Sequence, residues 1–236
     1  MNSQDTFIQK MQENHRLELS RISHEIRNPV TLINSSMQII ESEHPEVTSF
    51  AFWKEMREDM AYLRRLLDEF SGFNNSDKLC LADVNLTELL HTVTSQAKAL
   101  SPNQEIAFYS TVPLDLPTIV ADATKLRQAI TNVLRNAFET DASQVKLSCS
   151  VSDGQIKIDI QNNGSEIPKE YLPDLFTPFI THKKNGTGLG LAIVKRIIEA
   201  HHGQIILSSN PSGTCFSLRL PINTNASTKP DRNPPR

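Results

Sequence analysis

The sequence has few of the features that would indicate a secreted or membrane-bound chain. It contains three cysteines, Cys80, Cys149 and Cys215, and their wide spacing gives neither a CxxC pair nor a disulfide framework. No uninterrupted apolar run approaches the ~18 residues of a membrane span. The first residues also lack the basic-then-apolar pattern of a signal peptide. We therefore expect reduced thiols, no membrane span and a cytoplasmic location.

An excess of positive charge is also absent. The 236 residues include 24 Lys and Arg against 27 Asp and Glu, which gives a net charge of −3. A broad basic field is therefore missing, and we expect no binding to nucleic acid or to an anionic membrane. Hydrophobic residues make up 38% and charged residues 22% of the chain, as in ordinary globular proteins. The length suggests one large domain or two small ones.

The stretch around His24 has the apolar spacing of an amphipathic helix. Steps of three and four residues join Leu19, Ile22, Ile26, Pro29, Ile33, Met37 and Ile40. His24 is about 200° round the helix from Ile22 and Ile26, so it should point into solvent, with Glu25 beside it and Asn28 one turn further on. An exposed imidazole next to a carboxylate is a candidate nucleophile. The alternative is an ordinary solvated surface histidine.

A second helix follows a predicted turn at residues 41–46. Its apolar residues are spaced 3, 4, 3, 4, 3, as a seam between helices requires: Trp53, Met56, Met60, Leu63, Leu67 and Phe70. The two helices should form a hairpin domain over residues 1–74. Two copies would bury both stripes in a four-helix bundle, so we expect a homodimer. Alternatively, the hairpin packs on the domain that follows.

The pattern changes after a turn-rich linker at residues 71–77. Helices are predicted at about 83–100, 122–140 and 189–201, with a short one near 169–175. Strands are predicted at 106–109, 118–121, 145–151, 155–160, 204–209 and 214–220. This order indicates an α+β domain over residues 75–222, with helices on one face of a mixed or antiparallel sheet. Residues 223–236 are expected to be a disordered tail.

Three glycines at alternate positions lead directly into the last predicted helix. Gly186, Gly188 and Gly190 allow close backbone approach, and a helix N-terminus favours anions. The segment is therefore a candidate phosphate cradle, and Lys183 just before it could reach phosphates. A flexible glycine linker is the alternative.

Two asparagines lie four residues apart on the helix predicted after Asp122. Asn132 and Asn136 therefore share one helix face. Their amide oxygens, together with phosphate oxygens and water, would suit Mg²⁺. Ordinary surface polarity is the alternative.

Taken in order, six motifs resemble those of the sensor histidine kinases of bacterial two-component systems. They are His24-Glu25-Ile26-Arg27-Asn28-Pro29, Asn132 to Ala137, Asn163-Gly164, Phe176 to Phe179, Gly186 to Leu191 and Gly213-Thr214. The resemblance covers about residues 15–222. It implies a dimerising phosphotransfer hairpin followed by an ATP-binding domain of the Bergerat fold, an α/β two-layer sandwich.

The resemblance also implies roles for individual residues. His24 would be phosphorylated from Mg-ATP and pass the phosphoryl group to an aspartate in the receiver domain of a response regulator. Glu25 would be its acid–base partner, and Asn28 would position water for dephosphorylating the regulator. Asn136 would bind Mg²⁺, with Asn132 beside it.

The implied nucleotide contacts are Asn132, Asn136, Asn162, Gly164, Lys183, Gly186, Thr187, Gly188, Leu189, Gly190 and Thr214. The chain departs from the family at two positions. Asn162 stands where an Asp usually receives the adenine amino group, and Glu166 stands where a glycine is usual. The alternative functions are a regulator phosphatase, or a phosphotransfer or sequestering module with weakened ATP binding.

Overall fold

The computed structural model describes residues 3–100, 105–183 and 186–222. The chain forms two compact units: Met1–Asn75 with Phe179–Leu189, and Ser76–Pro178 with Gly190–Arg236. The tail predicted at 223–236 lies outside the described residues. Within the described part, every helix is too short or too polar to cross a membrane.

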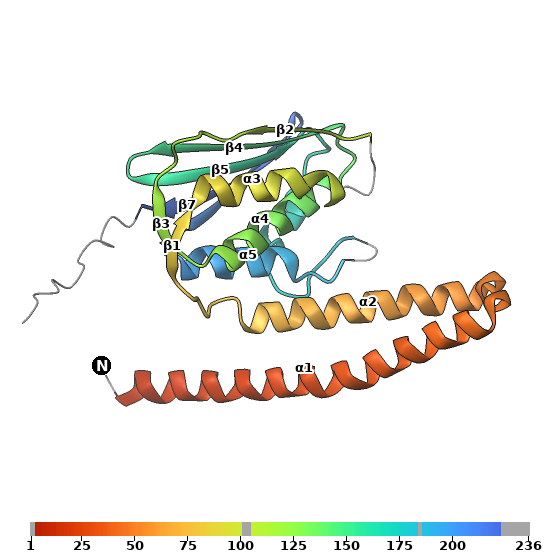
Figure 1. Ribbon diagram of the computed structural model, residues 1–236. Coiled ribbons are helices and arrows are strands. Elements are labelled where there is room, and N and C mark those ends of the chain that lie inside the picture. The colour runs from red at the N-terminus through yellow and green to blue at the C-terminus, as the bar shows by residue number, and fades with distance from the viewer. Residues whose placement is uncertain (1–2, 101–104, 184–185, 223–236) are drawn as a thin grey trace, which may run out of the picture. The chain divides into compact units, whose positions relative to one another are not determined.

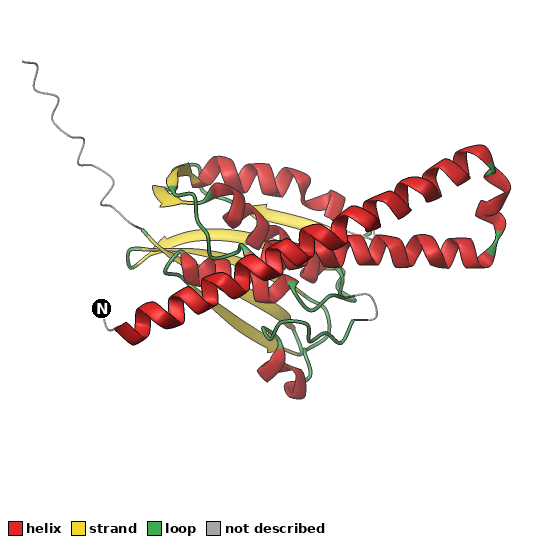
Figure 2. Ribbon diagram, turned by 90° about the horizontal axis from the view of Figure 1, so that it is seen from below, coloured by secondary structure: helices red, strands yellow, loops and turns green. Residues whose placement is uncertain are grey.

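The first unit is built on a helical hairpin (Figure 2). The long helix α1 (Ser3–Glu43) is followed by the short 3-10 helix η1 (Pro45–Ser49) and by α2 (Ala51–Asn74). Pro45 starts η1, where its missing amide donor costs nothing. The turn predicted at 41–46 is therefore correct in its second half, whereas residues 41–43 still belong to α1. The predicted linker is wrong in its first part, because α2 remains helical through Asn74.

The apolar stripe predicted on α1 divides into two faces. Ser23, Val30 and Met37, seven residues apart, are buried on the side that packs on α2. The isoleucines of the predicted stripe remain exposed in the single chain: Ile22 by 48%, Ile26 by 43%, Ile33 by 49% and Ile40 by 39%. Among Met37 and these four isoleucines, Met37 is thus the residue that α2 covers within the hairpin.

Polar side chains hold the end of the hairpin near η1. The indole Nε1 of Trp53 donates to Glu41 Oε1 at 2.8 Å, and Arg57 Nε lies 3.2 Å from the same oxygen. Trp53 was predicted as part of an apolar seam. Its ring is only half-buried, and its N–H supplies a directional bond between α1 and α2.

The second unit contains a five-stranded sheet in the order β2-β4-β5-β7-β6. Its strands are β2 (Ala107–Thr111), β4 (Gln144–Ser152), β5 (Gln155–Asn162), β6 (Gln204–Asn210) and β7 (Gly213–Pro221). β2 runs parallel to β4 and the other neighbours are antiparallel. The sheet is therefore mixed. The prediction allowed a mixed or an antiparallel sheet.

One face of this sheet forms the core with three helices (Figure 1). On β5, Ile156, Ile158 and Ile160 are at most 1% exposed, because alternate residues of a strand point to the same face. Asn162 continues this inward series at the end of the strand and is 3% exposed. The helices that cover the face are α3 (Leu86–Gln96), α4 (Ala123–Phe138) and α5 (Gly190–Ala200). Two 3-10 helices, η2 (Ala97–Leu100) and η3 (Lys169–Asp174), complete the unit.

A second, two-stranded sheet corrects one prediction. β1 (Ala82–Asn85) pairs antiparallel with β3 (Thr118–Ala121), whereas a helix was predicted from about residue 83. The helix follows directly after this strand, and an asparagine caps its first turn. Asn85 Oδ1 accepts from the amide of Glu88 at 3.1 Å, so α3 begins at Leu86.

Asp122 caps α4 and also joins separate parts of the unit. Its carboxylate accepts from the amides of Lys125 at 3.0 Å and Cys80 at 2.8 Å. Partial burial alone raises the pKa of Asp122, but these hydrogen bonds outweigh it, so the pKa lies below the usual 3.8. The carboxylate is therefore charged at neutral pH, and it satisfies amides of α4 and of the segment before β1.

His201, just after α5, completes this junction. Its Nε2 accepts from the amide of Asp122 at 3.0 Å, and its Nδ1 donates to the carbonyl of Ile197 at 2.8 Å. The two bonds require a neutral ring with the proton on Nδ1. Burial lowers the pKa of His201 below its usual 6.5, because it disfavours the charged ring.

We predict that His201 makes stability depend on pH. The unfolded chain takes up the proton before the folded chain does, so this contribution is complete above pH 6.5 and is lost as the pH falls toward the lower folded pKa. The loss grows with the difference between the unfolded and the folded pKa of His201, by about 1.4 kcal/mol for each unit of that difference. Denaturant unfolding at a series of pH values measures it.

His201→Gln keeps one donor and one acceptor but does not ionise in this range. It should flatten the curve between pH 7 and 5, while the change of the exposed His91 on α3, His91→Gln, should leave the slope unchanged. Equal slopes for the wild type and His201→Gln would show that the ring does not act in this way.

Candidate functional site

His24 is exposed on α1, as predicted. Its predicted partner Glu25 is also exposed, and its Oε1 lies 2.9 Å from Nε of Arg21, one turn earlier. The carboxylate is therefore paired with a guanidinium on the surface of α1. Sequence reasoning missed Arg21, although its spacing of four from Glu25 is that of a helical ion pair.

Hydroxyl groups fasten α1 to α2 beside His24. Ser23, 1% exposed, forms a 2.9 Å hydrogen bond between its Oγ and that of Ser71. Arg27 Nη2 donates to Ser71 Oγ at 3.2 Å, to the carbonyl of Leu67 at 3.2 Å and to Asp68 Oδ1 at 3.0 Å. These bonds fix the rotation of α1, so that His24 and Asn28 both lie on the exposed side.

On α4, both predicted asparagines are half-buried. Asn132 Nδ2 donates to the carbonyl of Gly190 at 3.3 Å and so joins α4 to the first residue of α5. This use of the amide nitrogen leaves Oδ1 as the atom of Asn132 suited to a cation. Asn136 lies one turn along the same helix face.

The end of β5 brings three other predicted residues together. Asn162 Oδ1 accepts from the amide of Gly164 at 2.9 Å, and Thr214 on β7 is the register partner of Asn162. Asn162 and Thr214 are each 3% exposed. Thr214 Oγ1 is 2.8 Å from Ser209 Oγ, which accepts from the amide of Ile167 at 2.9 Å. The result is a buried polar group beside an otherwise apolar sheet face.

Gly164 itself cannot carry a side chain without displacing its neighbours. A Cβ there would lie 2.7 Å from Asp141 Oδ1 and 2.9 Å from Thr140 Oγ1. Asp141 accepts from both the hydroxyl and the amide of Ser165, and these bonds lower the pKa of its carboxyl. Asn163 Oδ1 accepts from the amides of Ser143 and Gln144 at 3.0 and 2.8 Å. Asp141 and Asn163 therefore hold the turn, a role that the sequence did not indicate.

The glycine segment belongs to the first compact unit up to Leu189. Gly188 has φ 72°, and its carbonyl accepts from the amide of Phe179 at 3.1 Å. Thr187 donates to Glu69 on α2 and accepts from the amide of Leu189 at 3.3 Å. Phe179 lies with its ring centroid 6.2 Å from that of Phe70. Glu69 and Phe70 were not among the predicted site residues.

The remaining predicted residues differ in exposure. Leu189 is fully buried, whereas Lys183 is exposed and its amide donates to Thr181 Oγ1 at 3.2 Å. Gly186 is tightly enclosed, since a Cβ would lie 2.4 Å from Thr181 Oγ1. Gly190 begins α5, and a Cβ there would meet nothing within 4 Å. Space is therefore open at the N-terminus of α5, where amide groups favour an anion.

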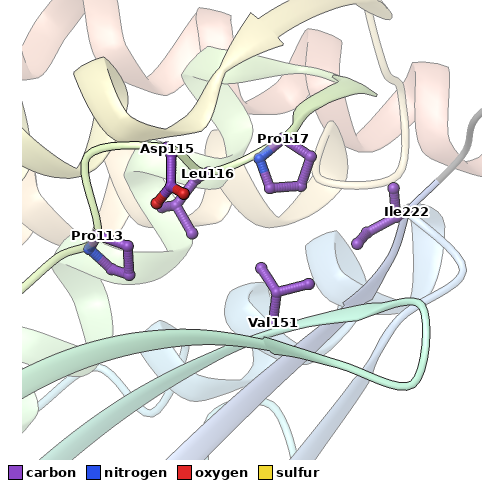
Figure 3. Close-up of a pocket in the computed structure, with 6 residues that line it drawn as sticks. All are labelled: Pro113, Asp115, Leu116, Pro117, Val151 and Ile222. Carbon is purple, nitrogen blue, oxygen red and sulfur yellow. The ribbon is translucent and has the colours of Figure 1, made fainter.

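A pocket of about 450 Å³ lies elsewhere in the second unit (Figure 3). It is lined by Pro113, Asp115, Leu116, Pro117, Val151 and Ile222. The lining is mainly apolar and contains none of the predicted site residues, so we assign it no part in the candidate site.

Comparison with known proteins supports the sequence motifs. Residues 121–224 match the family described as the histidine kinase-, DNA gyrase B- and HSP90-like ATPases. This range contains every predicted nucleotide contact, from Asn132 to Thr214.

Relatives extend the likeness into the hairpin. The signal transduction histidine-protein kinase AtoS of Escherichia coli K12 is 30% identical over 87% of this chain and 34% of AtoS. The sensory histidine kinase/phosphatase NtrB of Vibrio alginolyticus is 27% identical over 93% of this chain and 66% of NtrB. The chain thus spans about a third of AtoS and about two thirds of NtrB.

A solved structure has the same fold. Full-length ShkA in complex with AMPPNP aligns with a TM-score of 0.73 and 26% identity, over 86% of this chain and 45% of ShkA. The AMPPNP in that structure is a ligand of ShkA.

We predict that Gly188→Ala weakens nucleotide binding by at least about tenfold, because strained backbone must shift the whole segment. A Cβ would lie 2.6 Å from the carbonyl carbon of Phe179, and φ 72° is unfavourable for alanine. Calorimetry with Mg-ATP tests it. Gly154→Ala is the matched control, because Gly154 also has a positive φ but has open space around it. An unchanged affinity in Gly188→Ala would contradict the prediction.

Proposed function

Because the chain has the catalytic core of the sensor histidine kinases, we propose that it transfers the γ-phosphoryl group of ATP to His24. The phosphoryl group would then pass to an aspartate of a response regulator. The observation that carries this proposal is the exposed imidazole of His24 on a helix of the same chain that contains the ATPase fold. A phosphatase or a sequestering protein depends less than a kinase does on a histidine that accepts the phosphoryl group.

The described residues fit a nucleoside triphosphate. The N-terminus of α5 provides amide donors and open space at Gly190 for phosphates. The base of the nucleotide is uncharged, so it suits the buried polar group at the end of β5. Asn162 and Thr214 there are neutral hydrogen-bonding side chains. We therefore infer that the base lies toward Asn162 and the phosphates toward Gly190.

Asn136 is the residue we propose for Mg²⁺, with Asn132 beside it. The described residues hold no cluster of three His, Cys, Asp or Glu that would bind a metal by itself. A single amide oxygen is consistent with Mg²⁺, which keeps waters and binds through phosphate oxygens. The ion would neutralise charge on the phosphates as the phosphoryl group transfers.

The side chains of His24, Glu25 and Arg21 would take part in the phosphoryl transfer. One ring nitrogen forms the N–P bond as the bond to the ADP oxygen breaks, and the other nitrogen carries the ring proton. Glu25 would orient the ring and receive that proton. Arg21, which pairs with Glu25 on the exposed surface of α1, would add positive charge near the incoming phosphoryl group.

A response regulator would approach the exposed side of α1 around His24. Asn28 is exposed there too, one turn further along. An amide in this position could orient water toward the phosphorylated regulator, so dephosphorylation by Asn28 is the second candidate function. The relative NtrB is named a kinase/phosphatase, which supports this second candidate function.

We predict that Mg-ATP labels His24 with a phosphate that is lost in acid and kept in alkali, as expected of phosphohistidine. His24→Gln should abolish the label but leave nucleotide binding unchanged, because the side chain is exposed. Glu25→Gln should slow labelling by about 10²–10⁴-fold, the usual worth of a general base. Acid-labile labelling that persists in His24→Gln would place the acceptor elsewhere.

The hairpin's uncovered face supports a homodimer. Ile22, Ile26, Ile33 and Ile40 form a stripe that remains 39–49% exposed in one chain. A second copy would cover it and complete a four-helix bundle.

We predict that Ile33→Glu dissociates this dimer, because a buried unpaired charge is costly. Sedimentation at micromolar concentration should show a dimer for the wild type and a monomer for the variant. Ser35→Glu adds the same charge about 200° away on the exposed surface of α1, and it should stay dimeric. A monomeric wild type would refute the proposal.

A further inference from the structure

Asn162 has one amide group whose orientation the structure fixes. Its Oδ1 accepts from the amide of Gly164 at 2.9 Å. A backbone N–H can only donate, so the atom that faces Gly164 must be the oxygen. Nδ2, which is a donor, therefore faces the other way.

This Nδ2 has no hydrogen-bond partner among the residues that the structure describes. The residue as a whole is 3% exposed. Among the described residues, the unpartnered side-chain atom with no solvent-accessible surface is Nδ2 of Asn74. Nδ2 of Asn162, which is also unpartnered, therefore retains some accessible surface. A buried side chain whose one uncommitted group reaches accessible space is suited to meet a ligand. That group on Asn162 can only donate.

The backbone of Asn162 cannot move away from such a ligand. Gly213 on β7 lies so close that a Cβ on it would be 2.0 Å from the carbonyl oxygen of Asn162. Thr214 pairs with Asn162 in the ladder. The donor is therefore presented from a fixed position at the end of β5.

We propose that Asn162 makes the site accept 6-oxopurine nucleoside triphosphates, those of hypoxanthine and guanine, at least as well as ATP. This inference rests on the proposed function, in which the base lies toward Asn162. It concerns which base is bound, whereas the proposed function concerns the use of the triphosphate.

The chemistry of the purine six-position decides the preference. Adenine carries an amino group there, which is a donor, and guanine and hypoxanthine carry a carbonyl oxygen, which is an acceptor. Nδ2 of Asn162 pairs with the carbonyl and opposes the amino group. A carboxylate at this position has two acceptors, so it would receive the amino group and repel the carbonyl. Asn162 thus reverses the selectivity that an aspartate would give.

Competition between nucleotides tests this directly. Dissociation constants for Mg-ATP, Mg-ITP and Mg-GTP are measured on the whole chain by calorimetry and by displacement of a fluorescent nucleotide. ITP is the decisive probe, because hypoxanthine differs from adenine at the six-position and lacks the 2-amino group of guanine. We expect ITP to bind at least as tightly as ATP.

Asn162→Asp keeps the acceptor that Gly164 requires and replaces only the outward donor. It should shift the ratio of the ITP and ATP dissociation constants by at least about tenfold toward ATP, because a site that pairs with one polar group discriminates against its opposite. Gln161→Glu is the matched control. It makes the same change on the adjacent, exposed residue of β5, and it should leave the ratio unchanged.

The outcomes separate the two proposals. ATP binding that is tighter than ITP binding in the wild type would overturn this inference and leave the kinase proposal standing. An absence of binding by all three nucleotides would overturn both. If Asn162→Asp fails to fold, the wild-type comparison of ATP with ITP still decides the question.

Discussion

The candidate nucleotide site depends on the packing of α4 and α5 against one face of the five-stranded sheet. Ile156, Ile158 and Ile160 supply the sheet side of this core, and Val133 on α4 and Ile193 on α5 are fully buried. Close packing of this kind permits little sliding. It therefore fixes where α5 begins, which side of α4 carries its asparagines and where β5 ends. The asparagines of the site and Thr214 are each attached to the end or the edge of an element that the core holds.

Much of the second unit could be predicted because its signals are local. The alternation on β4 and β5, the Asp153-Gly154 turn with φ 53° and 70°, and the Asp122 cap each depend on residues within a few positions of one another. The glycine segment before α5 and the exposure of His24 were predicted for the same reason. Periodicity predicted the strand at 155–160, but neither its extension to Asn162 nor the lack of a partner for the amide nitrogen of that residue.

The features that sequence reasoning missed depend on contacts between distant parts of the chain. Ala82–Asn85 is a strand only because Thr118–Ala121 lies beside it, and nothing within the segment itself shows this. The stripe on α1 was read as one face, because the periodicity of a single helix does not show which residues a neighbouring helix covers. Ser71 bonds to Ser23 across 48 positions, and Asn163 bonds to Ser143 across 20. Single polar residues of this kind give no periodic signal.

The ring of His201 links the end of α5 to the first turn of α4 through the amide of Asp122. Asp122 is in turn bonded to Cys80, before β1. Three segments separated by at least 42 positions therefore share one small group of hydrogen bonds. Opening any one of them exposes buried polar atoms of the others, so these segments should open together as one cooperative unit in hydrogen exchange. The two helices that carry the proposed nucleotide contacts are thereby linked in their local unfolding, and a nucleotide held between them would slow exchange in both.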